Sequence, residues 1–313
     1  MPVDGQPLVG ARWSTVRRFA GYGAASALSL YLLVKMIWVV AGLLGHGSEV
    51  GGAEWIMLNV VTVGMAVIGI GLALALTRPL GRRIPAAPLV LVAWVGTGFL
   101  VPMIPFMLLS AALGGSGGDD GESTMPAWEG VFITIGFAGM AVGLAIAFPI
   151  YMLERFPDVF TGRLDDGRTN PSQRPVLVRG AVVVSAVLGV LWFAWAFGGT
   201  FGLEPDRRDL VDRNARLLMG TWGTAALAAA TSVHLIVRRH APRVPRWLLT
   251  MPAFVASGSL FAWNAWKLPL ALLKPGDYET PEYPPVALIE YALAIGAGLV
   301  LLTALLRAHR QPA

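Results

Sequence analysis

Long apolar stretches alternate with short polar segments along the whole chain. Eight of them reach about 20 residues or more, and at a rise of about 1.5 Å per residue each can cross a hydrocarbon core about 30 Å thick as an α-helix. The pattern therefore predicts an all-α polytopic membrane protein with eight transmembrane helices. These are expected at residues 22–44, 55–76, 88–113, 128–153, 176–198, 217–237, 247–272 and 285–306.

Basic residues gather in every second gap between these stretches. The two tails and the second, fourth and sixth gaps, with the residues next to them, hold 17 Lys and Arg residues, whereas the other gaps hold 5. Because short cytoplasmic loops are enriched in Lys and Arg, this asymmetry predicts a plasma-membrane protein with both termini in the cytoplasm. The fifth gap is an exception, because Arg207, Arg208, Arg213 and Arg216 stand there on the side expected to be outside.

The composition agrees with residence in a lipid bilayer. The chain is 55% hydrophobic and 14% charged, against about 25% charged residues in soluble domains. Its net charge of +5 is spread over short loops, which favours contact with anionic lipid headgroups and argues against a nucleic-acid interface. Cysteine is absent, so disulfides, thiolate metal sites and thiol redox chemistry are excluded.

The chain is expected to be a four-span unit used twice. Placing Gly98 on Gly258 also superimposes two Arg-x-Pro boundaries and sets Glu129 near Glu290. Four spans per half would make both halves point the same way through the membrane. The alternative is that spans rich in Ala, Gly and Leu align by chance. The predicted organisation is a basic cytoplasmic tail (1–21), a first half (22–153), a cytoplasmic connector (154–175), a second half (176–306) and a cytoplasmic tail (307–313).

Few ionisable residues lie inside the predicted spans, and the cost of placing a charge in a bilayer makes each a candidate for function. The predicted topology puts four of them, Lys35, Glu129, Lys267 and Glu290, in the outward half of the membrane. We expect an outward-facing polar cavity in which Glu290 pairs with Lys267 or Lys35. For Lys267, the alternative is that it extends to the interface within the aromatic belt. The candidate ligand-binding residues are Lys35, Trp38, Asn59, Glu129, Asn264, Lys267 and Glu290.

Motifs for catalysis or metal binding are missing from the sequence. His-Glu-x-x-His, Gly-x-Ser-x-Gly and Walker sequences do not occur. His234 is the only histidine within a predicted span, whereas haem ligation between helices needs histidine pairs. We therefore expect no metal and no other cofactor, and the sequence argues against an enzyme.

Two short tracts carry a resemblance to a known group of proteins. They are Tyr31-x3-Lys35-x2-Trp38-x3-Gly42 and Trp192-x2-Trp195-x2-Gly198-Gly199. They resemble uncharacterised multi-span membrane proteins of actinobacteria, in which a Lys/His-x-x-Trp-x-x-Gly-Gly pattern ends a span. The second tract has Trp192 where the first has Lys35, so the basic position is not kept in both. The resemblance implies a multi-span membrane fold and no particular activity.

Two functions from different classes follow from the sequence. The first is binding or transport of an anionic or zwitterionic small molecule through the outward-facing polar cavity. The alternative is a non-catalytic anchor or regulatory subunit, whose protein partner would bind the Arg-rich cytoplasmic loops. An intramembrane enzyme has the least support, because no catalytic set is present.

Overall fold

The computed structural model describes residues 10–45, 53–114, 127–157, 175–238, 244–275 and 278–308. Within these ranges the chain consists of helices joined by short turns, with one isolated β-bridge. Eight of the described helices, with α3 and α4 taken as one, are long and apolar enough to cross a membrane. The prediction of an all-helical, multi-pass membrane protein with eight candidate spans is confirmed by helix length and hydropathy.

The chain packs as two compact units. Unit 1 comprises Met1–Ala93 and Gly118–Phe160, and unit 2 comprises Trp94–Gly117 and Thr161–Ala313. The boundary falls inside α3 (Ala86–Leu100), because the second part of this helix packs on α9 (Arg246–Leu273) of unit 2. These units therefore do not coincide with the two predicted four-span halves, which stay a prediction. Most of the predicted connector, 158–174, lies outside the described residues.

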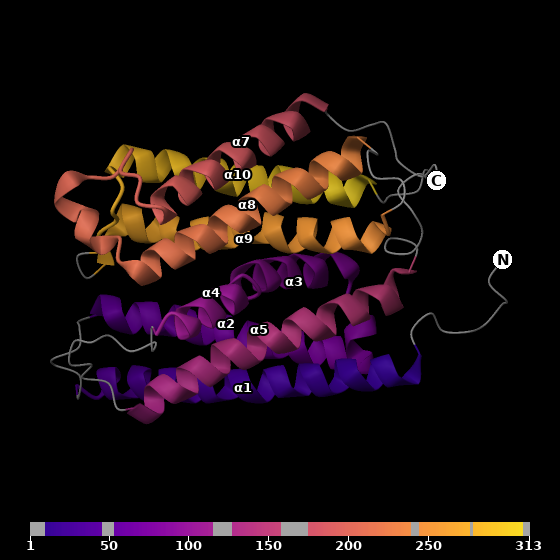
Figure 1. The fold of residues 1–313 in the computed structure, drawn as a ribbon. Helices are drawn as coiled ribbons and strands as arrows, with labels where there is room; N and C mark the ends of the chain where they lie inside the picture. Colours follow the sequence, from indigo (N-terminus) through magenta and orange to yellow (C-terminus); the bar gives the residue numbers. More distant parts are fainter. Residues whose placement is uncertain are drawn as a thin grey trace. The chain divides into compact units, whose positions relative to one another are not determined.

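Unit 1 is built around a close contact between two helices. It contains α1 (Ala11–Leu43), α2 (Ala53–Thr77), the 3-10 helix η1 (Pro79–Arg82), the start of α3, and α5 (Ala127–Arg155). α1 packs on both α2 and α5 (Figure 1). Cβ atoms added to Gly139 and Gly143 of α5 would lie 2.4 Å and 2.5 Å from the Cβ atoms of Ala27 and Ala24. Small residues thus bring the two backbones together, and van der Waals contact stabilises the pair within lipid.

Two arginines connect helix ends of unit 1 to neighbouring segments. Arg17 of α1 forms an ion pair with Glu154 of α5, with 3.3 Å between nitrogen and oxygen. Arg155 donates to the carbonyl oxygens of Gly81 and Ile84, at 2.8 Å and 2.7 Å. Both arginines belong to the 17 basic residues from which the orientation is predicted. In the structure they also pair with carbonyl and carboxylate groups at the ends of these helices.

Unit 2 is a closed four-helix bundle with two further helices against it. α7 (Pro175–Ala196) packs on α8 (Arg213–Arg238), α8 on α9, α9 on α10 (Pro284–Ala308), and α10 on α7 (Figure 1). The second part of α3 packs on α9, and α4 (Met103–Ala112) packs on α8. The 3-10 helix η2 (Pro205–Leu210) lies in the α7–α8 connection. The carboxylate of Asp212 then accepts a 2.6 Å hydrogen bond from the backbone of Ala215, which caps the start of α8.

α3 and α9 touch backbone to backbone inside unit 2. A Cβ atom on Gly98 would lie 2.1 Å from the carbonyl carbon of Gly258, and one on Gly258 would lie 2.4 Å from the carbonyl oxygen of Trp94. The fully buried Trp94 indole donates to Ser257 Oγ at 3.0 Å, and its ring lies 4.8 Å from that of Phe261. A tryptophan and a pair of glycines thus fix the crossing.

The third span is interrupted directly after this crossing. Val101 and Pro102 form a turn between α3 and α4. Pro102 and Pro105 have no N–H to donate, so the helical hydrogen-bond ladder fails here. The carbonyl of Val101 accepts a 3.1 Å bond from the N–H of Ile104 instead. Beyond this break, α4 packs on α8.

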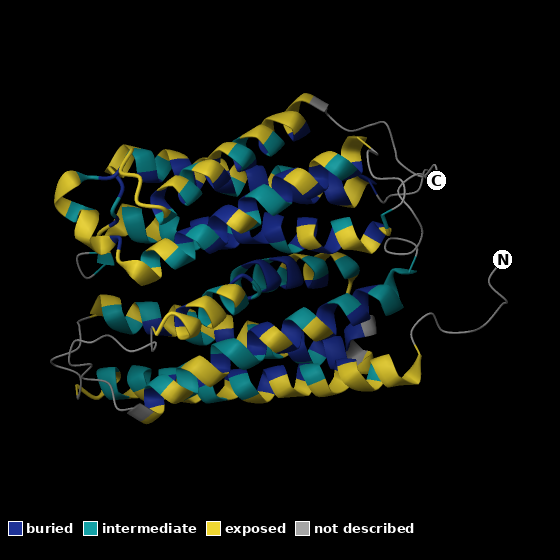
Figure 2. Ribbon diagram, in the orientation of Figure 1, coloured by how far each residue is buried: buried dark blue, intermediate teal, exposed yellow. Residues whose placement is uncertain are grey.

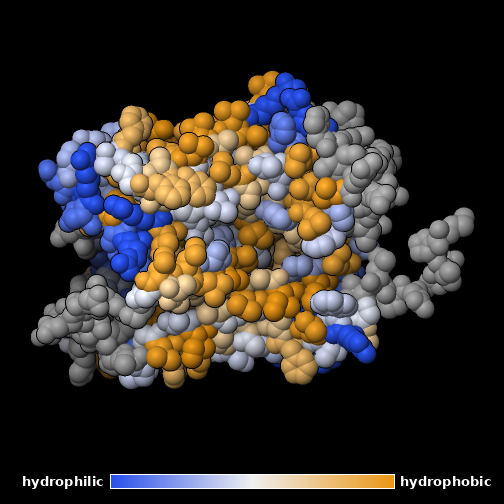
Figure 3. Space-filling view, viewed as in Figure 1, coloured by the Kyte–Doolittle hydropathy of each residue, from blue (hydrophilic) through white to orange (hydrophobic). Residues whose placement is uncertain are grey.

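The helices carry large apolar residues on their exposed faces as well as in their buried interior. On α7, Val183, Val187 and Val190 are 60%, 60% and 61% exposed, whereas Ser185 is 0% exposed. Figure 2 shows exposed residues along the helices, and in Figure 3 many of those surfaces are hydrophobic. Soluble monomers rarely expose apolar surface on this scale. The exposed apolar faces therefore fit contact with lipid.

Candidate functional site

Four of the candidate residues meet in a polar cluster of unit 1. Lys35 of α1 donates from Nζ to Asn59 Oδ1 of α2 at 2.9 Å. One turn further along α1, Trp38 donates from Nε1 to Glu129 Oε2 of α5 at 2.9 Å. Lys35 Nζ also lies 4.0 Å from the centroid of the Trp38 ring, within cation–π range. Asn59 is 3% and Glu129 8% exposed, so the cluster joins three helices of unit 1 in its interior.

No buried side-chain atom of this first cluster lacks a hydrogen-bond partner among the described residues. The amide nitrogen of Asn59 donates to the carbonyl oxygen of Trp55 at 2.9 Å, while its oxygen accepts from Lys35. Thr62 donates to the backbone oxygen of Asn59 at 2.8 Å. Buried polar groups that are all paired stabilise a unique packing and leave little capacity for a ligand. This network has the character of a structural link between helices.

A second polar cluster lies in unit 2 and is centred on Glu290 of α10. Trp192 of α7 donates from Nε1 to Glu290 Oε1 at 2.6 Å. Lys267 of α9 lies near enough for its charge to act on Glu290 and Glu282, but among the described residues no ion pair within 4.0 Å joins it to either carboxylate. Its Nζ lies 3.7 Å from the centroid of the Trp222 ring of α8. All four helices of the bundle thus contribute one side chain to a site that combines a carboxylate, an ammonium group and two indoles.

The second cluster differs from the first because some of its polar atoms are unused. Among the described residues, four buried side-chain atoms here have no hydrogen-bond partner: Glu290 Oε2, Glu282 Oε2, Asn264 Oδ1 and Trp222 Nε1. Glu290, Glu282 and Asn264 are each 2% exposed. Leaving such a group unpaired costs about 1–3 kcal/mol. Three acceptors and one donor are therefore left without a hydrogen-bond partner.

Two loops close this end of unit 2. The N–H of Glu204, in the α7–α8 loop, donates to the carbonyl oxygen of Pro281, in the α9–α10 loop, at 2.9 Å. Arg207 forms ion pairs with Glu204 at 3.0 Å and with Glu279 at 3.1 Å, so one guanidinium bridges both loops. Hydrophilic side chains gather at the η2 end of unit 2 in Figure 3. The cluster therefore lies close to a polar, cross-linked cap.

A pocket of about 220 Å³ lies between this cap and the adjoining helix turns. Its lining includes Ala271 of α9 and Ala287 of α10, which stand about one helical turn from Lys267 and Glu290. Tyr278 also lines it, and burial together with the carboxylate of Glu282 raises the pKa of that phenol above its usual value of 10.0. The volume is below the about 300–1,000 Å³ of drug-sized sites. A small solute is the size of molecule that fits.

The seven candidate residues thus fall into two groups. Lys35, Trp38, Asn59 and Glu129 meet in unit 1, and Asn264, Lys267 and Glu290 belong to unit 2. Sequence reasoning did not single out the partners Trp222 and Tyr291, whose ring centroid lies 5.3 Å from Lys267 Nζ.

One available signal for Trp222 was its bulk within the small-residue run of α8, Gly220 to Ala230. Tyr291 offered another, since it directly follows the intramembrane Glu290.

Comparison with known proteins adds no relative: no protein-family model matches the chain, and no curated protein or solved structure matches it.

Proposed function

We propose that the protein binds a small zwitterionic solute at the polar cluster of unit 2. The observation that carries this proposal is the set of unpaired buried atoms around Glu290. Solute N–H groups would donate to the free oxygens of Glu290, Glu282 and Asn264. The solute carboxylate would take the ammonium of Lys267 and the N–H of Trp222 as partners. The predicted topology puts the α7–α8 and α9–α10 loops outside the cell, so the solute would enter from that side.

The chemistry of the free atoms selects among zwitterions. Three of the four unpaired atoms are acceptors, so the cationic end of the solute must carry N–H donors. A primary ammonium satisfies this need, whereas a quaternary ammonium offers only its charge to the indole faces. Glycine, β-alanine or γ-aminobutyrate should therefore bind more tightly than glycine betaine.

Ligand-induced thermal stabilisation of the purified full-length protein tests this proposal. We expect glycine, β-alanine or γ-aminobutyrate to raise the unfolding midpoint, because a molecule that binds only the folded state stabilises it. Acetate and methylamine, which each carry one half of the zwitterion, should give smaller shifts. Glu290→Gln and Lys267→Met should each abolish the shift. If the zwitterions stabilise both variants as strongly as the wild type, the proposed site is wrong.

A comparison variant in unit 1 separates the two clusters. Lys35→Met removes a lysine that likewise lies over a tryptophan, but in a network whose groups are already paired. We expect this variant to keep the full ligand-induced shift. Loss of the shift in Lys35→Met alone would move the binding site to unit 1. A complete absence of stabilisation by every zwitterion would favour the anchor or regulatory role instead.

We also infer that the two four-span halves arose by duplication, and three features support this. Gly98 and Gly258, which align in the repeat, are in contact in unit 2. Thr97 and Ser257, the residues before them, each donate a hydroxyl to the carbonyl three residues earlier. Each half also has a tryptophan in its first span that donates to a glutamate in its fourth, although Trp192 aligns with Lys35 and so stands one helical turn before the position of Trp38. An experimental structure in which the first half does not superimpose on the second would overturn this inference.

A further inference from the structure

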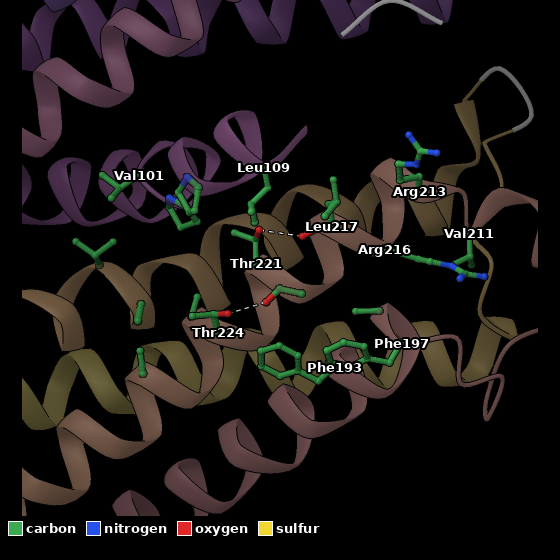
Figure 4. A pocket seen from close by; sticks show the side chains of 18 of the residues that line it. Val101, Leu109, Phe193, Phe197, Val211, Arg213, Arg216, Leu217, Thr221 and Thr224 are labelled. Carbon is green, nitrogen blue, oxygen red and sulfur yellow. Dashed lines mark hydrogen bonds between the residues drawn. The ribbon is translucent and has the colours of Figure 1, made fainter. Parts of the chain in front are cut away.

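A second feature of unit 2, independent of the polar cluster, is a long apolar groove. It has a volume of about 830 Å³ and is walled by α4, α7, α8 and α9 (Figure 4). Phe193 and Phe197 of α7 stack along one side with ring centroids 6.2 Å apart. Leu109 and Pro252, which also line it, are exposed. The groove therefore opens on the apolar surface of the helices.

The interior of the groove has almost no free hydrogen-bonding capacity. Its two threonines, Thr221 and Thr224, donate their hydroxyls to the carbonyl oxygens of Leu217 and Gly220 on their own helix, at 2.9 Å and 2.8 Å. Figure 4 shows both bonds along α8. Most other lining residues are Ala, Val, Leu, Phe, Pro or Gly. A polar solute would gain nothing here, whereas a hydrocarbon chain loses no hydrogen bond on entering.

One end of the groove carries a positive charge. Arg213 and Arg216 lie there, at the start of α8, and both are exposed (Figure 4). Asp212 stands beside them, but one of its oxygens is occupied by the N–H of Ala215 at 2.6 Å. Arg213 donates once, to the carbonyl oxygen of Leu113 at 3.2 Å. Two guanidinium groups against one carboxylate leave one net positive charge at this end.

These arginines stand at the end of the fifth gap, which breaks the charge asymmetry of the sequence. The positive-inside rule accounts for the other arginine clusters but not for basic residues in the fifth gap. Arg207 has a structural reason to be there, because it bridges the two loops. Arg213 and Arg216 have no carboxylate partner within salt-bridge distance among the described residues. Their position at the mouth of an apolar groove indicates a role in binding a ligand there.

We propose that the groove holds an acyl chain of an anionic phospholipid whose phosphate is bound by Arg213 and Arg216. From Arg213 to Ala228 the groove follows α8 for about 22 Å at 1.5 Å per residue. This exceeds the about 15 Å of one leaflet, half of a core about 30 Å thick. A full-length chain therefore fits with its headgroup at the arginine end. Guanidinium groups bind phosphate oxygens with paired, charge-assisted hydrogen bonds.

Lipid-dependent unfolding of the purified full-length protein tests this proposal. We expect phosphatidylglycerol to raise the unfolding midpoint more than phosphatidylcholine at the same mole fraction. In the double variant Arg213→Gln, Arg216→Gln, the apparent affinity for phosphatidylglycerol should fall about tenfold or more, because two charged hydrogen-bonding partners are lost. Arg208→Gln is the matched control: Arg208 is exposed in the loop before α8 and does not line the groove. It should keep the wild-type preference.

Two further experiments distinguish a lipid phosphate from free phosphate and test whether the acyl chain lies in the groove. Inorganic phosphate alone should give no stabilisation; a shift equal to that of the lipid would show an anion site without a chain and overturn the proposal. Gly220→Leu puts a side chain into the groove from α8 and should reduce the phospholipid bound in native mass spectrometry. Undiminished lipid binding by this variant, or an unchanged preference in the double arginine variant, would also overturn it.

Discussion

Gly98 of α3 and Gly258 of α9 cross so closely that a Cβ atom on Gly98 would lie 2.1 Å from the carbonyl carbon of Gly258. The obstacle is backbone rather than the end of a flexible side chain, so it cannot rotate away. The indole of Trp94 is hydrogen-bonded across the same crossing to Ser257. Any residue larger than glycine at position 98 must therefore push two helices apart.

Gly98→Ala should destabilise unit 2 by about 1–3 kcal/mol, the usual cost of overpacking a close contact. Gly296→Ala in α10 is the control, because a Cβ atom there meets nothing within 4 Å. That substitution should be neutral or stabilising by up to about 1 kcal/mol, since alanine favours helix. Unfolding of the two variants in detergent measures both effects. Equal stability of the two variants would contradict the crossing geometry.

Trp192→Phe should destabilise the protein by about 1–3 kcal/mol, because it removes the indole N–H that donates to buried Glu290 at 2.6 Å. The effect should largely vanish when Glu290 is already replaced by Met. A double-mutant cycle of unfolding free energies should give a coupling of about 0.5–3 kcal/mol. Trp195→Phe, which loses a bond to the backbone oxygen of Phe201, should be additive with Glu290→Met. If Trp192→Phe and Trp195→Phe were both additive with Glu290→Met, the interaction between Trp192 and Glu290 would be refuted.

The predicted orientation can be read from single cysteines, because the chain has none of its own. Arg208→Cys, in the α7–α8 loop, should react with a membrane-impermeant maleimide in intact cells. Arg83→Cys, between α2 and α3, should react only after permeabilisation. Both positions are exposed in the structure, so access to solvent is matched. The reverse labelling pattern would mean that the arginine asymmetry misleads about orientation.

Tyr278 should make stability fall at alkaline pH. Burial and the charge of Glu282 raise the pKa of its phenol in the folded state, so the folded protein holds this proton more tightly than the unfolded chain. Stability from this group is therefore complete below the unfolded pKa of about 10 and is lost as pH rises above it. Tyr278→Phe should flatten the curve of unfolding midpoint against pH in this range. An unchanged alkaline slope would exclude Tyr278 as its cause.

The polar clusters show how far sequence reasoning reached. Lys35, Lys267 and Glu290 were identifiable because a charge in an apolar span is costly and rare. Their partners were not identifiable in this way. The sequence is equally compatible with a pair between Glu290 and Lys267 and with one between Glu290 and Lys35. In the structure Lys267 lies in the unit of Glu290, while Lys35 donates to Asn59. The pairing depends on which helix faces pack together. In a chain rich in Ala, Gly and Leu many faces are similar in shape, so the sequence does not show which of them meet.

The sequence by itself determined the helices, because a membrane span must satisfy its backbone hydrogen bonds internally and an apolar stretch of sufficient length does so as an α-helix. Only the tertiary structure decided which polar atoms are paired and which are left without a partner among the described residues. That outcome rests on close approaches such as Gly98 with Gly258 and on the proline break before α4, which bring distant segments together. Such contacts depend on shape at single residues rather than on hydrophobicity along a span.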